Sequence, residues 1–75
     1  MFKRIELSPI DGRKSFYGKA YAEKAGNYIT LYSYNTKICT YNTETGEIIK
    51  HPAFDYSMTT KRHQRAFFYT FGITA

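Results

Sequence analysis

Two consecutive segments of this chain have the sequence pattern of β-strands, and this pattern limits the possible folds more than any other feature of the sequence. The run YITLYSY (28–34) is rich in β-branched and aromatic residues and alternates at period two, which is typical of a strand. Ile29 and Leu31 point to one side of that strand. A turn or bulge at Asn35 leads into a further strand, TKICTY (36–41). The pattern therefore predicts neighbouring strands of an antiparallel sheet.

Three more segments have strand character. Residues 2–7 alternate loosely, and residues 47–50 follow a segment with the composition of a hairpin loop. Residues 16–23 alternate at period two, although a helix over 19–25 is an alternative. The inner face of the strand at 16–23 would consist of Phe16, Gly18, Ala20 and Ala22.

A helix is predicted from residue 60 to residue 69 or 70, with Thr59 as its N-cap, Ser57 as the alternative, and Gly72 to end it. At about 100° per residue, its apolar side holds His63, Gln64, Phe67 and Phe71, flanked by Ala66 and Phe68. Its opposite side holds Lys61, Arg62, Arg65 and Tyr69. Strands followed by one helix indicate an α+β domain, with a three- or four-stranded antiparallel sheet against a C-terminal helix.

The length and the cysteine content indicate a single domain without disulfides. With 75 residues the chain has room for a single domain spanning residues 1–75. Its one cysteine, Cys39, excludes an intramolecular disulfide, and together with His51 and His63 it lacks the spacing of a metal site. The chain begins without the apolar run of a signal peptide, and no stretch approaches the roughly 20 apolar residues that span a bilayer. We therefore expect a cytoplasmic monomer with no cofactor and no membrane partner.

The charge suggests the first candidate site. A formal net charge of +5 favours nucleic acid, an acidic protein or an anionic membrane surface as partner, although it also fits a basic domain that binds nothing anionic. The candidate nucleic-acid-binding residues are Lys61, Arg62, Arg65 and Tyr69. Lys and Arg neutralise phosphates and a tyrosine ring stacks on a base, but an ordinary solvated helix face is the alternative.

The tyrosines suggest the second candidate site. Tyr28, Tyr32 and Tyr34 would share the outward side of one strand, with Tyr17, Tyr21 and Tyr41 on other strands. An open face of tyrosines resembles the stacking platforms of single-strand binders and also a protein interface. The other interpretation is that the rings cover a thin sheet while their hydroxyls stay in water.

No catalytic group is expected. His63 lies near Thr59, Thr60 and Asp55 in sequence, but no nucleophile-elbow spacing or glycine-rich oxyanion loop accompanies them. The helix phase puts His63 on the packed side, where we expect a hydrogen bond to the backbone. Cys39, on an alternating strand, is expected to be a buried thiol without a base beside it.

Three segments carry a resemblance to a known family. KSFYGKA (14–20), LYSYNT (31–36) and YSMTTKRH (56–63) follow one another in the chain. They resemble the SFYGKA, LxSYxT and YSxTTxRH motifs of small uncharacterised domains carried by phages and conjugative transposons of Gram-positive gut bacteria. The resemblance covers most of the chain and implies a short curved sheet packed against one helix. It implies a mobile-element origin but no activity, ligand or catalytic residue, and the AFFY ending (66–69) departs from the family's aliphatic one.

These features predict a small accessory binding domain of a mobile genetic element, not an enzyme, with weak, sequence-tolerant binding of nucleic acid. The alternative is a protein-interaction module or inhibitor that contacts a host or element-encoded protein through Tyr28, Tyr32 and Tyr34. Salt distinguishes the two, because counterion release makes phosphate binding fall steeply as salt rises.

Overall fold

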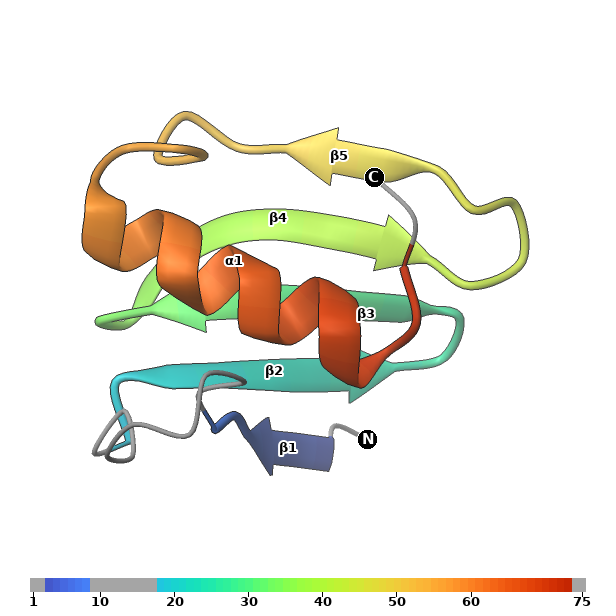
Figure 1. Cartoon of the computed structure of the whole chain (residues 1–75). Helices are drawn as coiled ribbons and strands as arrows, with labels where there is room; N and C mark the ends of the chain where they lie inside the picture. The colour runs from blue at the N-terminus through green and yellow to red at the C-terminus, as the bar shows by residue number, and fades with distance from the viewer. Residues whose placement is uncertain (1–2, 9–17, 74–75) are drawn as a thin grey trace.

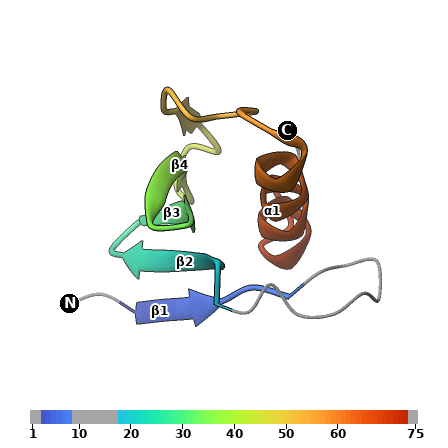
Figure 2. The same cartoon turned by 90° about the vertical axis from the view of Figure 1, so that its left-hand side faces the viewer.

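The strands of the sheet pair in the order in which they occur along the chain. The computed structural model describes residues 3–8 and 18–73. Its elements are β1 (Lys3–Glu6), β2 (Ala20–Ala25), β3 (Tyr28–Ser33), β4 (Thr36–Asn42), β5 (Ile48–Lys50) and α1 (Met58–Thr70). Each strand runs antiparallel to the next, and α1 lies along one face of the sheet (Figure 1). Figure 2 shows the opposite face of the sheet without a covering helix among the described residues.

The α+β class is confirmed, but the sheet has five strands where three or four were expected. The difference lies at the edges, because β1 with four residues and β5 with three both pair with a neighbour. The segment predicted at 16–23 pairs from Ala20 onward as β2, so the helical alternative over 19–25 is wrong. Its residues 16 and 17 lie outside the described part of the chain. Ala20 and Ala22 are buried, as their alternation predicted.

Two-residue turns join β2 to β3 and β3 to β4. The second turn places Tyr34 at φ 52° and Asn35 at φ 65°. Hairpins of this length favour positive φ because the resulting turn matches the twist of the flanking strands. Asparagine tolerates this conformation, whereas it costs a bulky residue such as tyrosine of order 1–3 kcal/mol. Tyr34 therefore belongs to the turn, and the strand predicted over 28–34 ends one residue earlier, at Ser33.

A bulge interrupts the pairing of β3 with β4. Leu31 pairs with Cys39 and Tyr32 pairs with Lys37, so Ile38 is an extra residue on β4. Ile38 and Cys39 are both buried although they are adjacent in sequence. A bulge has this effect because the extra residue breaks the alternation of side chains between the two faces.

The helix α1 begins two residues before the predicted start, and its N-cap is Ser57 rather than Thr59. The Oγ of Ser57 accepts a hydrogen bond from the backbone N–H of Thr60 at 3.1 Å, which satisfies one donor of the first turn. The helix ends at Thr70, as predicted, and Gly72 follows with a left-handed φ of 64°. Among the described residues, no helix combines the length and apolar character needed to cross a bilayer.

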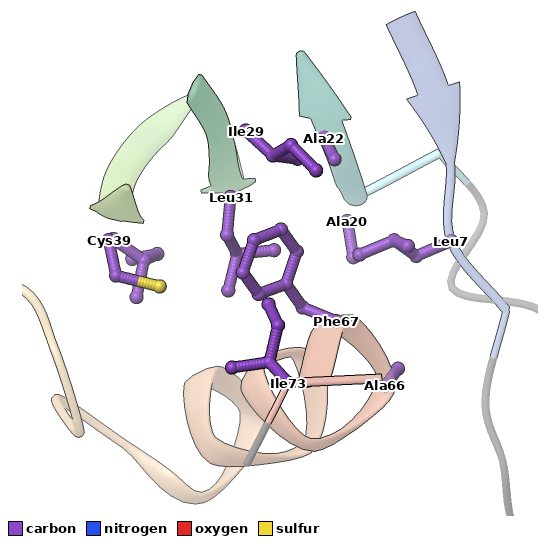
Figure 3. Packing of buried hydrophobic residues seen from close by; sticks show 10 residues of the cluster. Leu7, Ala20, Ala22, Ile29, Leu31, Cys39, Ala66, Phe67 and Ile73 are labelled. Carbon is purple, nitrogen blue, oxygen red and sulfur yellow. The ribbon is translucent and has the colours of Figure 1, made fainter. Parts of the chain in front are cut away.

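The core lies between α1 and the inner face of the sheet. Phe67 from the C-terminal half of α1 is completely buried, as the helix phase predicted. Figure 3 shows its ring directed from the helix toward Leu31 of β3, with Ile73 alongside. The small side chains Ala20 and Ala22 leave room on β2 for this large ring. Burial of aromatic area supplies much of the stability of so short a chain.

Candidate functional site

The outward face of α1 brings together three of the four residues predicted to bind nucleic acid. Lys61 and Arg65 are exposed, and Tyr69 is 73% exposed. Their four-residue spacing places them along one stripe of the helix, on the side opposite Phe67. Arg62 is half-buried and lies beside this stripe. We call Lys61, Arg62, Arg65 and Tyr69 the basic helix face.

The inward side of α1 carries a buried hydrogen bond that the sequence did not indicate. Nδ1 of His63 and Oγ of Ser33 on β3 lie 2.7 Å apart, and both side chains are buried. One partner of His63 is thus a serine hydroxyl. Desolvation lowers the pKa of His63, with a smaller contribution from the charge of Arg62, so the ring favours its neutral form. One signal was available: Ser33 continues the inward series of Ile29 and Leu31.

Asp55 does not complete a triad with His63. Its carboxylate Oδ1 accepts from Nε2 of Gln64 at 2.7 Å, and its backbone N–H donates to Oε1 of Gln64 at 2.7 Å. This reciprocal pair fastens the loop that precedes α1 to the helix. Thr60 likewise bonds to the Ser57 hydroxyl, at 3.1 Å. The hydroxyls and carboxylate near His63 in sequence therefore fix the start of the helix.

The predicted row of tyrosines divides into three environments. Tyr28 is 48% exposed on the outward face of β3. Tyr32 is half-buried and its ring stacks on Tyr21 of β2, with centroids 5.2 Å apart and planes 9° from parallel. Tyr34 lies in the turn, and its ring is 5.9 Å from that of the inward-facing His63. The expectation that Tyr34 shares a face with Tyr28 and Tyr32 is wrong, because positive φ turns the chain at that residue.

The centre of the outward sheet face is occupied by its own side chains. The guanidinium carbon of Arg4 lies 3.9 Å from the ring centroid of Tyr21. The Tyr21 hydroxyl donates to Oδ1 of Asn35 at 2.9 Å. Burial raises the pKa of Tyr32, and the Glu23 carboxylate beside it acts in the same direction. These rings already have aromatic and cationic partners, so the centre of this face offers little free ring surface for stacking.

A cavity of about 490 Å³ opens between the β3–β4 turn, the loop before α1 and the first turn of α1. Tyr34, 58% exposed, and Tyr56, 81% exposed, both line it. The remaining lining combines the apolar side chains of Ile38 and Ala53 with five hydroxyl residues: Ser33, Thr36, Ser57, Thr59 and Thr60. The lining residues come from the two segments 33–38 and 53–60, which lie far apart in sequence but meet at one end of the sheet (Figure 1). We call this site the tyrosine cavity.

Cys39 is buried in the core, and desolvation raises the pKa of its thiol to about 12. The expected burial of the side chain is confirmed. In residues 3–8 and 18–73, no three His, Cys, Asp or Glu side chains are grouped so that they could share a metal ion.

Comparison with known proteins identifies the family. The model of a family of unknown function, DUF8033, matches residues 5–75, nearly the whole chain. The chain belongs to this family. The expected membership of an uncharacterised family is thereby confirmed. Neither the curated proteins nor the solved structures contain a significant match.

Proposed function

We propose that this domain binds nucleic acid weakly and without sequence preference through the basic helix face. The observation that carries the proposal is the alignment of Lys61, Arg65 and Tyr69 on one exposed stripe of a rigid element. Lysine and arginine side chains neutralise phosphates, and the exposed ring of Tyr69 stacks on an unpaired base.

The distribution of charge supports the same proposal. The thirteen residues of α1 contain three of the eleven cationic side chains of the chain and none of its six acidic ones. More than half of the net charge of +5 therefore lies on a single helix. Cations fixed on one face of a helix create a local positive potential that attracts polyanions. The side chains of this face approach the phosphate backbone rather than base edges, which is why sequence preference is not expected.

The resemblance of the segments 14–20, 31–36 and 56–63 supports a second part of the proposal, namely that the domain is an accessory factor of a phage or conjugative transposon. Such a factor would act in the cytoplasm, where the nucleic acid of the element is accessible. No part of this proposal requires an enzymatic step or a cofactor.

Fluorescence anisotropy with labelled single-stranded and duplex oligonucleotides tests the basic helix face. The variant Lys61→Ala/Arg62→Ala/Arg65→Ala should lose most of the binding. Its matched control is Lys3→Ala/Lys24→Ala/Lys37→Ala, which removes the same charge from exposed positions on the sheet. Both variants are first checked for intact folding by circular dichroism.

We expect dissociation constants in the micromolar range or weaker and a log–log salt slope of about −2 to −3, at roughly 0.7–0.9 per phosphate contact. Tyr69→Ala should weaken single-strand binding more than duplex binding, because stacking needs an unpaired base. Equal losses in the two triple variants would show that only total charge matters. Absence of binding at low salt would refute the proposal outright.

A protein partner is the second candidate function. It is favoured by two large side chains on the face of the sheet away from α1, Tyr28 and Ile49, which are 48% and 47% exposed. Their strands pair through β4, which places both on the outward face. A host or element-encoded protein captured by this face should be lost on Tyr28→Ala/Ile49→Lys and retained at high salt. A steeply salt-dependent capture would instead point back to the basic helix face.

A further inference from the structure

The tyrosine cavity has the dimensions and lining of a ligand site. Its volume of about 490 Å³ lies within the range of about 300–1,000 Å³ that is typical of small-molecule pockets. Tyr34 enters it from the β3–β4 turn, and Tyr56 enters it from the loop before α1. Two rings that are mostly exposed at one cavity provide flat apolar surfaces, and the hydroxyls of Thr36 and Thr59 provide hydrogen-bonding groups near them.

The position of Tyr34 in this cavity is maintained against a local cost. Its φ of 52° is uncommon for any residue except glycine, asparagine and aspartate, and the neighbouring Asn35 shows what such a turn ordinarily selects. The backbone N–H of Tyr34 donates to the carbonyl oxygen of Lys19 at 2.8 Å, which holds the turn against the start of β2. Strained residues that the surrounding structure keeps in place concentrate at binding and catalytic sites.

The net charge near the cavity is positive, because two cations, Lys19 and Lys61, outnumber one carboxylate, Asp55. Nζ of Lys19 lies 5.6 Å from the ring centroid of Tyr34. Lys61 is exposed in the first turn of α1, directly after the lining residue Thr60. The nearby carboxylate of Asp55 is engaged by the side chain of Gln64. The chemistry that fits two rings, several hydroxyls and a cationic rim is a flat ring joined to an anion.

We propose that the tyrosine cavity binds one unpaired nucleotide, with its base stacked on Tyr56 beside Tyr34 and its phosphate toward Lys19 and Lys61. The proposal rests on the proposed function, and it specifies which part of a nucleic acid the domain prefers. The lining residue Thr60 precedes Tyr69 on α1 by nine residues, which is about 14 Å along the helix axis at 1.5 Å per residue. A base bound in the cavity would therefore lie near the N-terminal end of the basic helix face. A single strand could therefore run from the cavity along Lys61 and Arg65 to a second stacking ring.

Two-dimensional amide NMR of the 15N-labelled chain tests the proposal, with adenosine 5′-monophosphate, adenosine, glucose and a deoxyadenosine hexamer as probes. The monophosphate and the hexamer should both shift amides of residues 33–36 and 53–60. Adenosine should bind several-fold more weakly, because it lacks the phosphate. Comparison of the monophosphate with the hexamer distinguishes a free nucleotide from a nucleic-acid strand as the natural ligand. If the natural ligand is a strand, the hexamer should bind more tightly than the monophosphate.

Tyr56→Ala is the decisive variant, because a side chain that is 81% exposed contributes little to folding. It should weaken binding of the hexamer roughly tenfold, as expected for the loss of one stacked base. Tyr56→Phe should retain binding, and Tyr28→Ala, on the opposite face of the sheet, should leave it unchanged. Amide spectra of each variant establish that the fold is intact.

The outcomes separate the two proposals. The nucleotide site in the cavity is refuted if Tyr56→Ala leaves hexamer binding unchanged and the monophosphate shifts no amides of the cavity. If hexamer binding still depends on the cations of α1, the proposal for the basic helix face stands. If the monophosphate shifts the cavity amides but the hexamer does not bind, the cavity is supported as a nucleotide site and the proposal for the basic helix face is refuted. Adenosine or glucose binding as tightly as the monophosphate overturns the assignment of a nucleotide.

Discussion

Replacing Phe67 by alanine should remove the largest fully buried side chain from the space between α1 and the sheet. The ring is 0% exposed and lies 5.3 Å from the ring of Phe71 and 5.9 Å from that of Phe68, measured between centroids. Truncations of this kind cost about 3–5 kcal/mol, which combines lost transfer free energy with the cavity left behind. A chain of 75 residues has about 4–11 kcal/mol in total, at roughly 0.05–0.15 kcal/mol per residue. The variant is therefore expected to be marginally folded.

Urea unfolding followed by circular dichroism measures this loss. With an m-value of about 1 kcal/mol per molar urea, the midpoint should fall by about 3–5 M. Phe67→Leu keeps most of the apolar volume and should lose much less, so it gives a measurable transition if the alanine variant does not fold. Tyr69→Ala is the exposed aromatic control and should change stability by no more than about 0.5 kcal/mol. A loss below about 1 kcal/mol for Phe67→Ala would refute the packing described for the helix.

Four further predictions follow from single side chains. Burial lowers the folded-state pKa of His63, so the unfolded chain binds the proton more tightly than the folded chain does. The urea midpoint of unfolding should therefore fall as pH drops below about 6.5, and His63→Gln should reduce this dependence of the midpoint on pH. Tyr34→Asn should raise stability by about 0.5–1 kcal/mol by relieving positive φ, while binding of adenosine 5′-monophosphate falls; unchanged or lower stability in urea would argue against strain. The Cys39 thiol, with its pKa raised to about 12, should react with a disulfide reagent far more slowly in the folded than in the denatured chain, and equal rates would contradict its burial. Ser57→Ala should cost about 1 kcal/mol in the same urea assay through loss of the N-cap, whereas Thr59→Ala should not.

Within the regular parts of the strands and the helix, local patterns were sufficient to predict which side chains face the core. Period-two alternation placed Ala20, Ala22, Ile29 and Leu31 inward, and the 3.6-residue period placed Phe67 inward and Lys61 and Arg65 outward. These predictions succeeded because a side chain's face follows from its own position within a regular element. The basic helix face is therefore predictable from sequence alone.

Tertiary structure decided the features that depend on irregular backbone or on distant partners. Two irregularities break the alternation on which the prediction depended. The bulge adds Ile38 to the core, and the positive φ of Tyr34 turns that residue away from the outward face of the sheet. Ser33 and His63 are 30 residues apart, and nothing in either local pattern selects the other as its partner. The tyrosine cavity likewise forms only where the β3–β4 turn meets the start of α1. Local periodicity determined which way side chains face, whereas the docking of the helix on the sheet determined which of them meet, because that choice depends on packing summed over the whole core.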